Sequence, residues 1–152
     1  MRSASATFRK ARLAAGLLLF VAPTPALAQD MTMRDALHSS YSLWGMMDGI
    51  ANFCAEVMQG DFAYSAAYID WLTRNIIIVD ELNAALAQSG ESTSLSDEGR
   101  TAGSDGILEL VRPAVNHEEI CMAWKAETER GAYEAETFLA VRLGLLRERD
   151  GM

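Results

Sequence analysis

The feature that most constrains the fold is a long run of apolar residues at helical spacing over residues 33–58. Intervals of three and four place such residues on one face of an α-helix and do not fit the period of two of a β-strand. Thr32 and Asp35 stand before the run as an N-cap and an acid in the first turn. The expected buried stripe is Leu37, Tyr41, Trp44, Met47, Ala51, Cys54 and Met58. We therefore expect a first helix over 33–58.

A second helical pattern occupies residues 62–87, after the short connection Gln59-Gly60-Asp61. Because this connection is short, the second helix should fold back antiparallel to the first. The run from Ile76 to Val79 is apolar on every side, so this helix should be central in the bundle or offer a face to a partner. Its four β-branched residues also fit a short buried strand, although helical spacing continues on both sides. The expected core stripe is Phe62, Ala66, Ile69, Leu72, Ile76, Val79, Leu82 and Leu86.

Residues 88–106 contain five serines, two threonines and four glycines, which is a composition typical of loops. We expect a mobile loop here, with a short helix near 95–100 or a docking segment as alternatives. Shorter helices are then expected over 105–112, ended by Pro113, from 117 to about Gly131, and over 132–149. The last helix should bury Phe138, Leu139, Val141, Leu145 and Leu146.

These patterns together predict an all-α fold. No segment alternates at period two for long enough to build a sheet, and no internal repeat occurs. We expect a single-domain bundle of four to five helices over residues 29–152, in which two long antiparallel helices come first. Gly45 and Gly49 lie four residues apart within the first helix. Because glycine is costly inside a helix, we expect a neighbouring backbone to come close there, within the bundle or in an oligomer.

The first 28 residues have the three parts of a cleaved secretory signal. Four basic residues precede the apolar run 13–22, and the segment ends in Ala26-Leu27-Ala28. An uncleaved membrane anchor is the alternative, but the apolar run is shorter than the roughly 20 residues of a membrane span. We expect export, a periplasmic or secreted location, and no stable membrane insertion after cleavage.

Removal of the signal makes the remaining chain distinctly acidic. The whole sequence has 13 basic and 21 acidic residues and a net charge of −8. Four basic residues and no acidic ones leave with residues 1–28, so the mature 124 residues carry nine basic charges, 21 acidic charges and a net charge of −12. Such a field disfavours binding to nucleic acid or to anionic lipid. Solubility alone accounts for the acidic charge, and attraction of a basic protein partner is the alternative.

Two cysteines, Cys54 and Cys121, remain in the mature chain. An isolated pair in a small exported domain usually forms one bridge, so we expect a disulfide between them. Closing a loop of this length would stabilise the fold by about 4 kcal/mol in the chain-entropy picture.

Sequence patterns for cofactors and catalysis are weak. C-x-x-C-H is missing, which excludes covalent c-type haem, and no P-loop, dinucleotide fingerprint or G-x-S-x-G occurs. His117 and Cys121 share a helical face, and Met31, Met33 and His38 could bind copper. We nevertheless expect no metal and no cofactor, because histidines are few and methionine fills bundle cores readily.

The leading functional hypothesis is a non-enzymatic envelope protein that binds another envelope protein, as assembly factors, inhibitors, immunity proteins and stress chaperones do. Tyr64, Tyr68 and Trp71 form an aromatic row beside the expected core stripe and are the candidate partner surface. A helical bundle that binds a small ligand or copper is the second hypothesis. An envelope hydrolase is the third, since paired carboxylates can cleave glycans.

Overall fold

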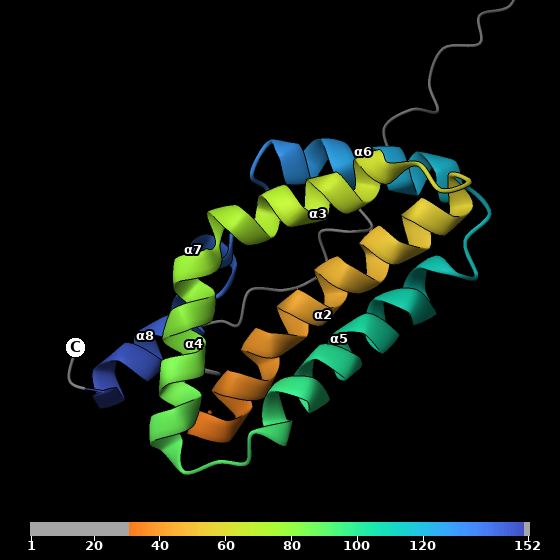
Figure 1. Cartoon of the computed structure of the whole chain (residues 1–152). Helices are drawn as coiled ribbons and strands as arrows, with labels where there is room; N and C mark the ends of the chain where they lie inside the picture. Colours follow the sequence, from red (N-terminus) through yellow and green to blue (C-terminus); the bar gives the residue numbers. More distant parts are fainter. Residues whose placement is uncertain (1–30, 151–152) are drawn as a thin grey trace, which may run out of the picture.

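The computed structural model describes residues 31–150, and within this range the chain is all-α, as predicted (Figure 1). The predicted signal, residues 1–28, lies outside the described residues. No described helix combines the length and the apolar character needed to cross a membrane. The helices are α2 (Met33–Val57), α3 (Phe62–Arg74), α4 (Ile76–Ser89), α5 (Ser94–Val111), α6 (His117–Glu129), α7 (Ala135–Phe138) and α8 (Ala140–Asp150).

Helix α2 is the central helix of the bundle and matches the predicted first helix. Thr32 and Asp35 form a capping box, in which each side chain accepts a hydrogen bond from the other residue's backbone N–H. The Thr32 hydroxyl, which donates to the Asp35 carboxylate at 2.6 Å, and the Thr32 backbone N–H together hold the pKa of this carboxyl below its ordinary value. Most of the helix is buried on several sides, because α3, α4, α5, α6 and α8 all contact it.

The predicted disulfide is confirmed. Cys54, near the end of α2, is bonded to Cys121 in α6, with an S–S distance of 2.06 Å and a Cα–Cα distance of 5.3 Å. Both residues are fully buried in the core. The bridge therefore joins the central helix to the second half of the chain.

The predicted loop over 88–106 is wrong, because most of it belongs to α5. This helix runs parallel to α2, and the two backbones meet through glycines on both sides. A Cβ at Gly99 would lie 2.6 Å from the carbonyl oxygen of His38, and one at Gly103 would overlap the carbonyl oxygen of Ser42. The serines and glycines that resembled a linker thus allow two helices to approach closely.

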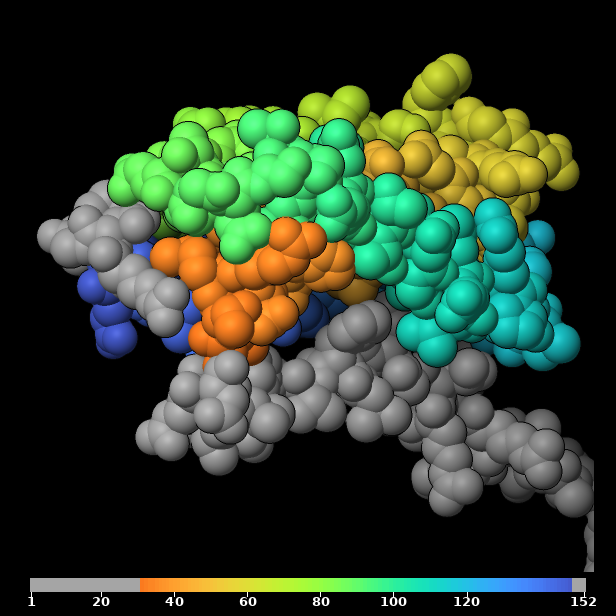
Figure 2. All heavy atoms as spheres, turned by 90° about the horizontal axis from the view of Figure 1, so that it is seen from below, coloured from red at the N-terminus to blue at the C-terminus, as the bar shows by residue number. Residues whose placement is uncertain are grey.

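The α2 side of this contact confirms the expectation of tight packing at Gly45 and Gly49. A Cβ at Gly45 would overlap the carbonyl oxygen of Arg100, and one at Gly49 would lie 2.7 Å from the hydroxyl oxygen of Ser104. The space-filling view from below shows the first half of α2 lying directly against α4 and α5 (Figure 2). The close approach is therefore made within the bundle.

The predicted second helix is divided in two at Asn75, where the chain turns sharply from α3 into α4 (Figure 1). Its antiparallel course against α2 is as predicted, because Trp44 contacts Trp71 while Tyr41 is hydrogen-bonded to Asn83, further along the chain. The Asn75 side chain is buried at the bend. Its Nδ2 donates to the carbonyl oxygen of Trp71 at 2.8 Å, and its Oδ1 accepts from the backbone N–H of Ala135 at 2.7 Å.

Replacing this amide should destabilise the bundle. Asn75→Ala leaves the buried N–H of Ala135 without its acceptor, so we expect the free energy of unfolding to fall by about 2 kcal/mol. Urea denaturation measures the change. Asn52→Ala is the matched control, because Asn52 is exposed on α2 and should change stability by less than about 0.5 kcal/mol. Equal effects of the two substitutions would contradict the role of Asn75.

The final predicted helix, 132–149, is likewise divided, into α7 and α8, with Leu139 between them. Leu139 and Leu146 are buried as expected, whereas Phe138, Val141 and Leu145 are half-buried. Arg147 of α8 forms ion pairs with Glu81 of α4 and Glu136 of α7. These contacts hold α8 against α4 and α7.

Candidate interaction face and ligand pocket

The structure does not place the aromatic row on the surface. Trp71 is fully buried and Tyr64 is 3% exposed, while Tyr68 is half-buried against Trp71. The indole N–H of Trp71 donates to the carbonyl oxygen of Tyr133 at 2.7 Å, and Tyr64 stacks on Trp124. The prediction that these three residues form a partner surface is therefore wrong. They anchor α3 to α2, α6 and the segment before α7.

The opposite side of the same helices is exposed and apolar. Successive residues of a helix are about 100° apart, so Phe62 lies about 200° from Tyr64. Phe62 is 85% exposed, Ile69 58% and Ile77 69%. Part of the predicted core stripe thus points to solvent. We call this surface the outer face, and its residues are Phe62, Ala66, Ile69, Thr73, Ile76 and Ile77.

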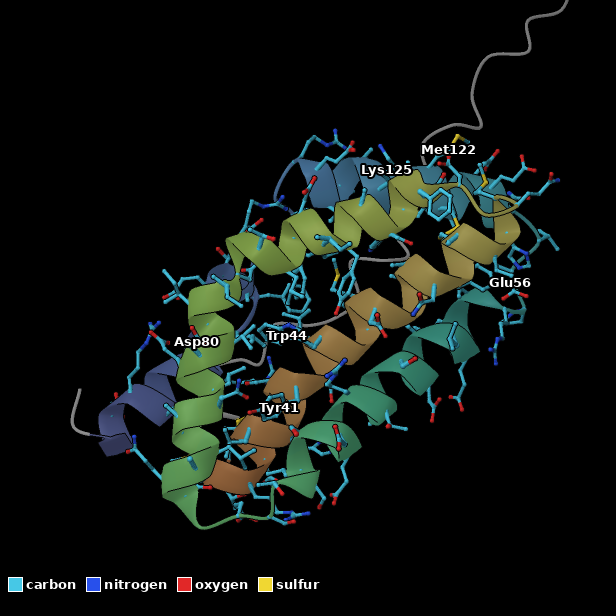
Figure 3. All side chains as sticks on the ribbon, in the orientation of Figure 1. Tyr41, Trp44, Glu56, Asp80, Met122 and Lys125 are labelled. Atoms are coloured by element: carbon cyan, nitrogen blue, oxygen red, sulfur yellow. A yellow bond between two sulfur atoms is a disulfide. The ribbon has the colours of Figure 1, made fainter. Side chains whose placement is uncertain are left out.

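Acidic side chains accompany the outer face. Asp61 lies at the start of α3, Asp70 lies beside Ile69, and Asp80 follows on α4, where Figure 3 labels it. All three are exposed, and none of them forms an ion pair with another described residue. Arg74, the cation nearest in sequence, is instead bound to Glu134 and to the carbonyl oxygen of Thr128. The outer face is thus bordered by negative charge.

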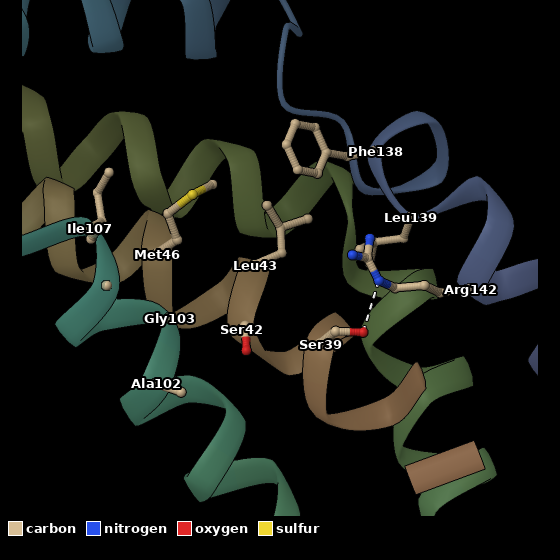
Figure 4. A pocket seen from close by; sticks show the side chains of 11 residues that line it. Ser39, Ser42, Leu43, Met46, Ala102, Gly103, Ile107, Phe138, Leu139 and Arg142 are labelled. Atoms are coloured by element: carbon tan, nitrogen blue, oxygen red, sulfur yellow. Dashed lines mark hydrogen bonds between the residues drawn. The ribbon is translucent and has the colours of Figure 1, made fainter. Parts of the chain in front are cut away.

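A separate pocket of about 210 Å³ lies between α2, α5 and the junction of α7 with α8 (Figure 4). Leu43 and Met46 enter it from α2, Ile107 from α5, and Phe138 and Leu139 from the junction. The remaining lining residues are Ser39, Ser42, Ala102, Gly103, Gly106 and Arg142. The wall is mostly apolar, and Arg142 is the one charged side chain among these described lining residues.

Within the part of the chain that the structure describes, Arg142 makes one hydrogen bond, from its Nε–H to the hydroxyl oxygen of Ser39 at 2.8 Å. Burial lowers the pKa of the Arg142 guanidinium from its ordinary value, because a charge is disfavoured where water is partly excluded. The Ser39 hydroxyl in turn donates to the carbonyl oxygen of Asp35 at 2.7 Å. Among residues 31–150, no carboxylate forms an ion pair with Arg142.

Comparison with known proteins gives no family and no relative for this chain. No family model, curated protein or solved structure matches the chain.

Of the metal candidates from the sequence, the pair of His117 and Cys121 is not available as a ligand pair in the structure. Nowhere in residues 31–150 do three or more His, Cys, Asp or Glu side chains form a group suited to a metal ion. His117 packs edge-on against Phe53, with ring centroids 5.1 Å apart, and its Nε2 is 3.2 Å from the carbonyl oxygen of Arg112. Met31 and Met33 pack against the core. Cys121 is held in the disulfide and cannot act as a thiolate ligand.

Sequence reasoning missed Arg142 and its pocket. The only signal is a cation at 142 within the apolar pattern of 138–146, which is unremarkable for a helix near the surface. Its hydrogen-bond partner Ser39 is 103 residues away in the chain. No local spacing connects the two residues, so the pocket emerges only from the packing of α8 against α2.

Proposed function

We propose that the protein is an exported, non-enzymatic binding protein that docks on a basic protein of the cell envelope through the outer face of α3 and α4. The proposal of export, to the periplasm or the medium, rests on the signal pattern of residues 1–28 and on the disulfide between Cys54 and Cys121. A structural disulfide persists in oxidising compartments and is rare in a reducing cytosol.

The observation that carries the docking proposal is the exposure of large apolar side chains along α3 and at the start of α4. Phe62, Ile69, Ile76 and Ile77 are each about half exposed or more. Single exposed apolar residues are ordinary, but a run of them along neighbouring helical turns is typical of an interaction site. The buried aromatic residues on the other side of α3 fix the helix, so the outer face is presented on a rigid element.

The charge at the outer face selects the class of partner. Asp61, Asp70 and Asp80 are exposed without an ion pair to any described residue, and the mature chain has a net charge of −12. A partner with basic residues around an apolar ridge would bury the isoleucines and neutralise the aspartates, and its approach would be accelerated by the field. A second copy of this chain would bring aspartates against aspartates, so self-association through this face is disfavoured.

A charge placed in the outer face should abolish docking without unfolding the protein. We expect Ile69→Glu to reduce capture of the basic partner from envelope extract at least ten-fold, because a carboxylate would be buried in an apolar contact. The thermal midpoint should stay unchanged, since residue 69 is exposed. Immunoblotting or mass spectrometry of the captured protein measures the loss.

The control is Leu110→Glu, which introduces the same charge at a residue of matched exposure on α5. Leu110 is 61% exposed and Ile69 is 58% exposed. Capture should survive Leu110→Glu and should weaken with added salt. Equal retention by both variants, or capture of an acidic protein, would refute docking through the outer face.

A further inference from the structure

The pocket beside Arg142 is separate from the outer face and has a distinct chemistry. Its wall is mostly apolar on α2, α5 and the α7–α8 junction, and the half-buried guanidinium of Arg142 is the only charge among the described residues that line it. A charge that is partly removed from water is costly unless another group compensates it. The pocket therefore combines an apolar volume with a cation that no carboxylate of the described residues compensates.

The hydrogen bonds around Arg142 leave most of its donors available. A guanidinium carries five N–H groups, and only the Nε–H of Arg142 has an acceptor among the described residues. The two serines in the wall do not compete for a ligand, because both bond to carbonyl oxygens of their own helix. Ser39 donates to Asp35 at 2.7 Å, and Ser42 donates to His38 at 3.0 Å. Both terminal nitrogens of Arg142 can thus receive a ligand's oxygen atoms.

We propose that this pocket binds a small amphiphilic carboxylate, with its head group on the terminal N–H groups of Arg142 and its apolar body between Leu43, Met46 and Ile107. Arginine is suited to this role because its planar fork matches the two oxygens of a carboxylate. A few polar groups in an otherwise apolar wall are the usual composition of a small-ligand site.

The volume of the pocket sets the size of the ligand. A cavity of about 150 Å³ holds benzene, which has six carbon atoms. The pocket of about 210 Å³ therefore fits an apolar body of about eight carbon atoms. A medium-chain fatty acid or an arylalkanoic acid has this size, and octanoate is a suitable probe. The apolar body supplies most of the affinity, and Arg142 selects the charge of the head group.

Gly106 allows the pocket to be closed without disturbing the fold. It lines the pocket, and a Cβ built on it has no neighbour within 4 Å. Leucine at this position should fill the space that the ligand would occupy, while favouring the helical conformation of α5. Gly144 of α8 is the matched control, because it also has open space around its Cβ position but does not line the pocket.

Isothermal titration calorimetry of the purified exported protein with octanoate tests the proposal. We expect saturable binding of one octanoate, with affinity at least ten-fold higher than for octanol or octylamine. Arg142→Gln should weaken octanoate binding about ten-fold or more while leaving octanol binding unchanged. Gly106→Leu should abolish binding at an equal or higher melting temperature, and Gly144→Leu should retain it.

Three results would overturn the proposal. Octanoate could fail to bind at millimolar concentration, it could bind no better than octanol, or its affinity could be unchanged in both Arg142→Gln and Gly106→Leu. Because none of these residues belongs to the outer face, loss of ligand binding leaves partner capture intact, and Ile69→Glu should bind octanoate normally. The two proposals therefore fail independently.

Discussion

Gly103→Ala should lower the free energy of unfolding by about 3 kcal/mol, a large effect for one added methyl group. The new Cβ would overlap the carbonyl oxygen of Ser42 in α2. Backbone atoms cannot move aside by changing rotamer, so α2 and α5 would have to separate along their contact. Urea denaturation, with the slope monitored for two-state behaviour, measures the loss.

The matched control lies one turn further along the same helix. Gly106→Ala adds the same methyl group where no atom lies within 4 Å of the Cβ position. It should raise the free energy of unfolding by about 0.5–1 kcal/mol, because alanine favours the helix and restricts the unfolded chain. The two substitutions therefore have opposite expected signs. A stabilising Gly103→Ala would show that α5 does not pack closely on α2.

Removal of the disulfide should lower the free energy of unfolding by a similar amount. The double variant Cys54→Ala, Cys121→Ala releases a cross-link between residues 67 apart in the chain, for which the chain-entropy relation gives about 4 kcal/mol. Loss of two buried sulfur atoms adds to this. We expect a lower urea midpoint and a lower melting temperature than in the oxidised protein.

Reduction of the wild-type protein measures the effect of the cross-link alone, because it breaks the S–S bond and leaves the two sulfur atoms in place. A strong reductant should lower the melting temperature of the wild type and leave that of the double variant unchanged. Mass spectrometry without reductant should give a mass two hydrogens below that of the dithiol. An equal melting temperature of the wild-type protein with and without reductant would contradict a stabilising role of the bridge.

The sequence predicts those parts of the fold that depend on a local residue pattern or on whether the compartment is oxidising. The spacing of Leu37, Tyr41 and Trp44 predicted α2, and the Thr32–Asp35 pair predicted its start. The disulfide follows from two cysteines in a chain with a predicted export signal. These inferences succeeded because helix periodicity, capping and cysteine pairing each have one dominant physical cause.

The predicted loop over 88–106 is wrong because the spacing of its residues, and not their composition, determines the structure of this segment. Serine and glycine are common in loops, but Gly99 and Gly103 recur at the same interval of four as Gly45 and Gly49. Leu95 and Ile107 stand one turn before and after this pair and are buried. This spacing is present in the sequence. It indicates a helix contact only when α2, from a distant part of the chain, packs against these glycines.

The prediction of which face of α3 is buried is wrong for a different reason. Because Ile69 is more hydrophobic than tyrosine, the sequence predicts a core stripe through Phe62 and Ile69. Trp71 and Tyr64 bury larger surfaces, and the polar N–H of Trp71 is satisfied by the carbonyl oxygen of Tyr133. The bend at Asn75 also breaks the stripe that continued into Leu82, which is buried as predicted. Tertiary packing therefore decided which face of this helix became the core.

The most direct test of the account is site-specific photocrosslinking in cells that export the protein. A photoreactive amino acid at residue 69 should yield a single adduct with one basic envelope protein, because the outer face is the proposed docking surface. The same probe at residue 110, which is equally exposed on α5, should yield no such adduct. Absence of an adduct at residue 69, or the same adduct from both positions, would contradict the central claim.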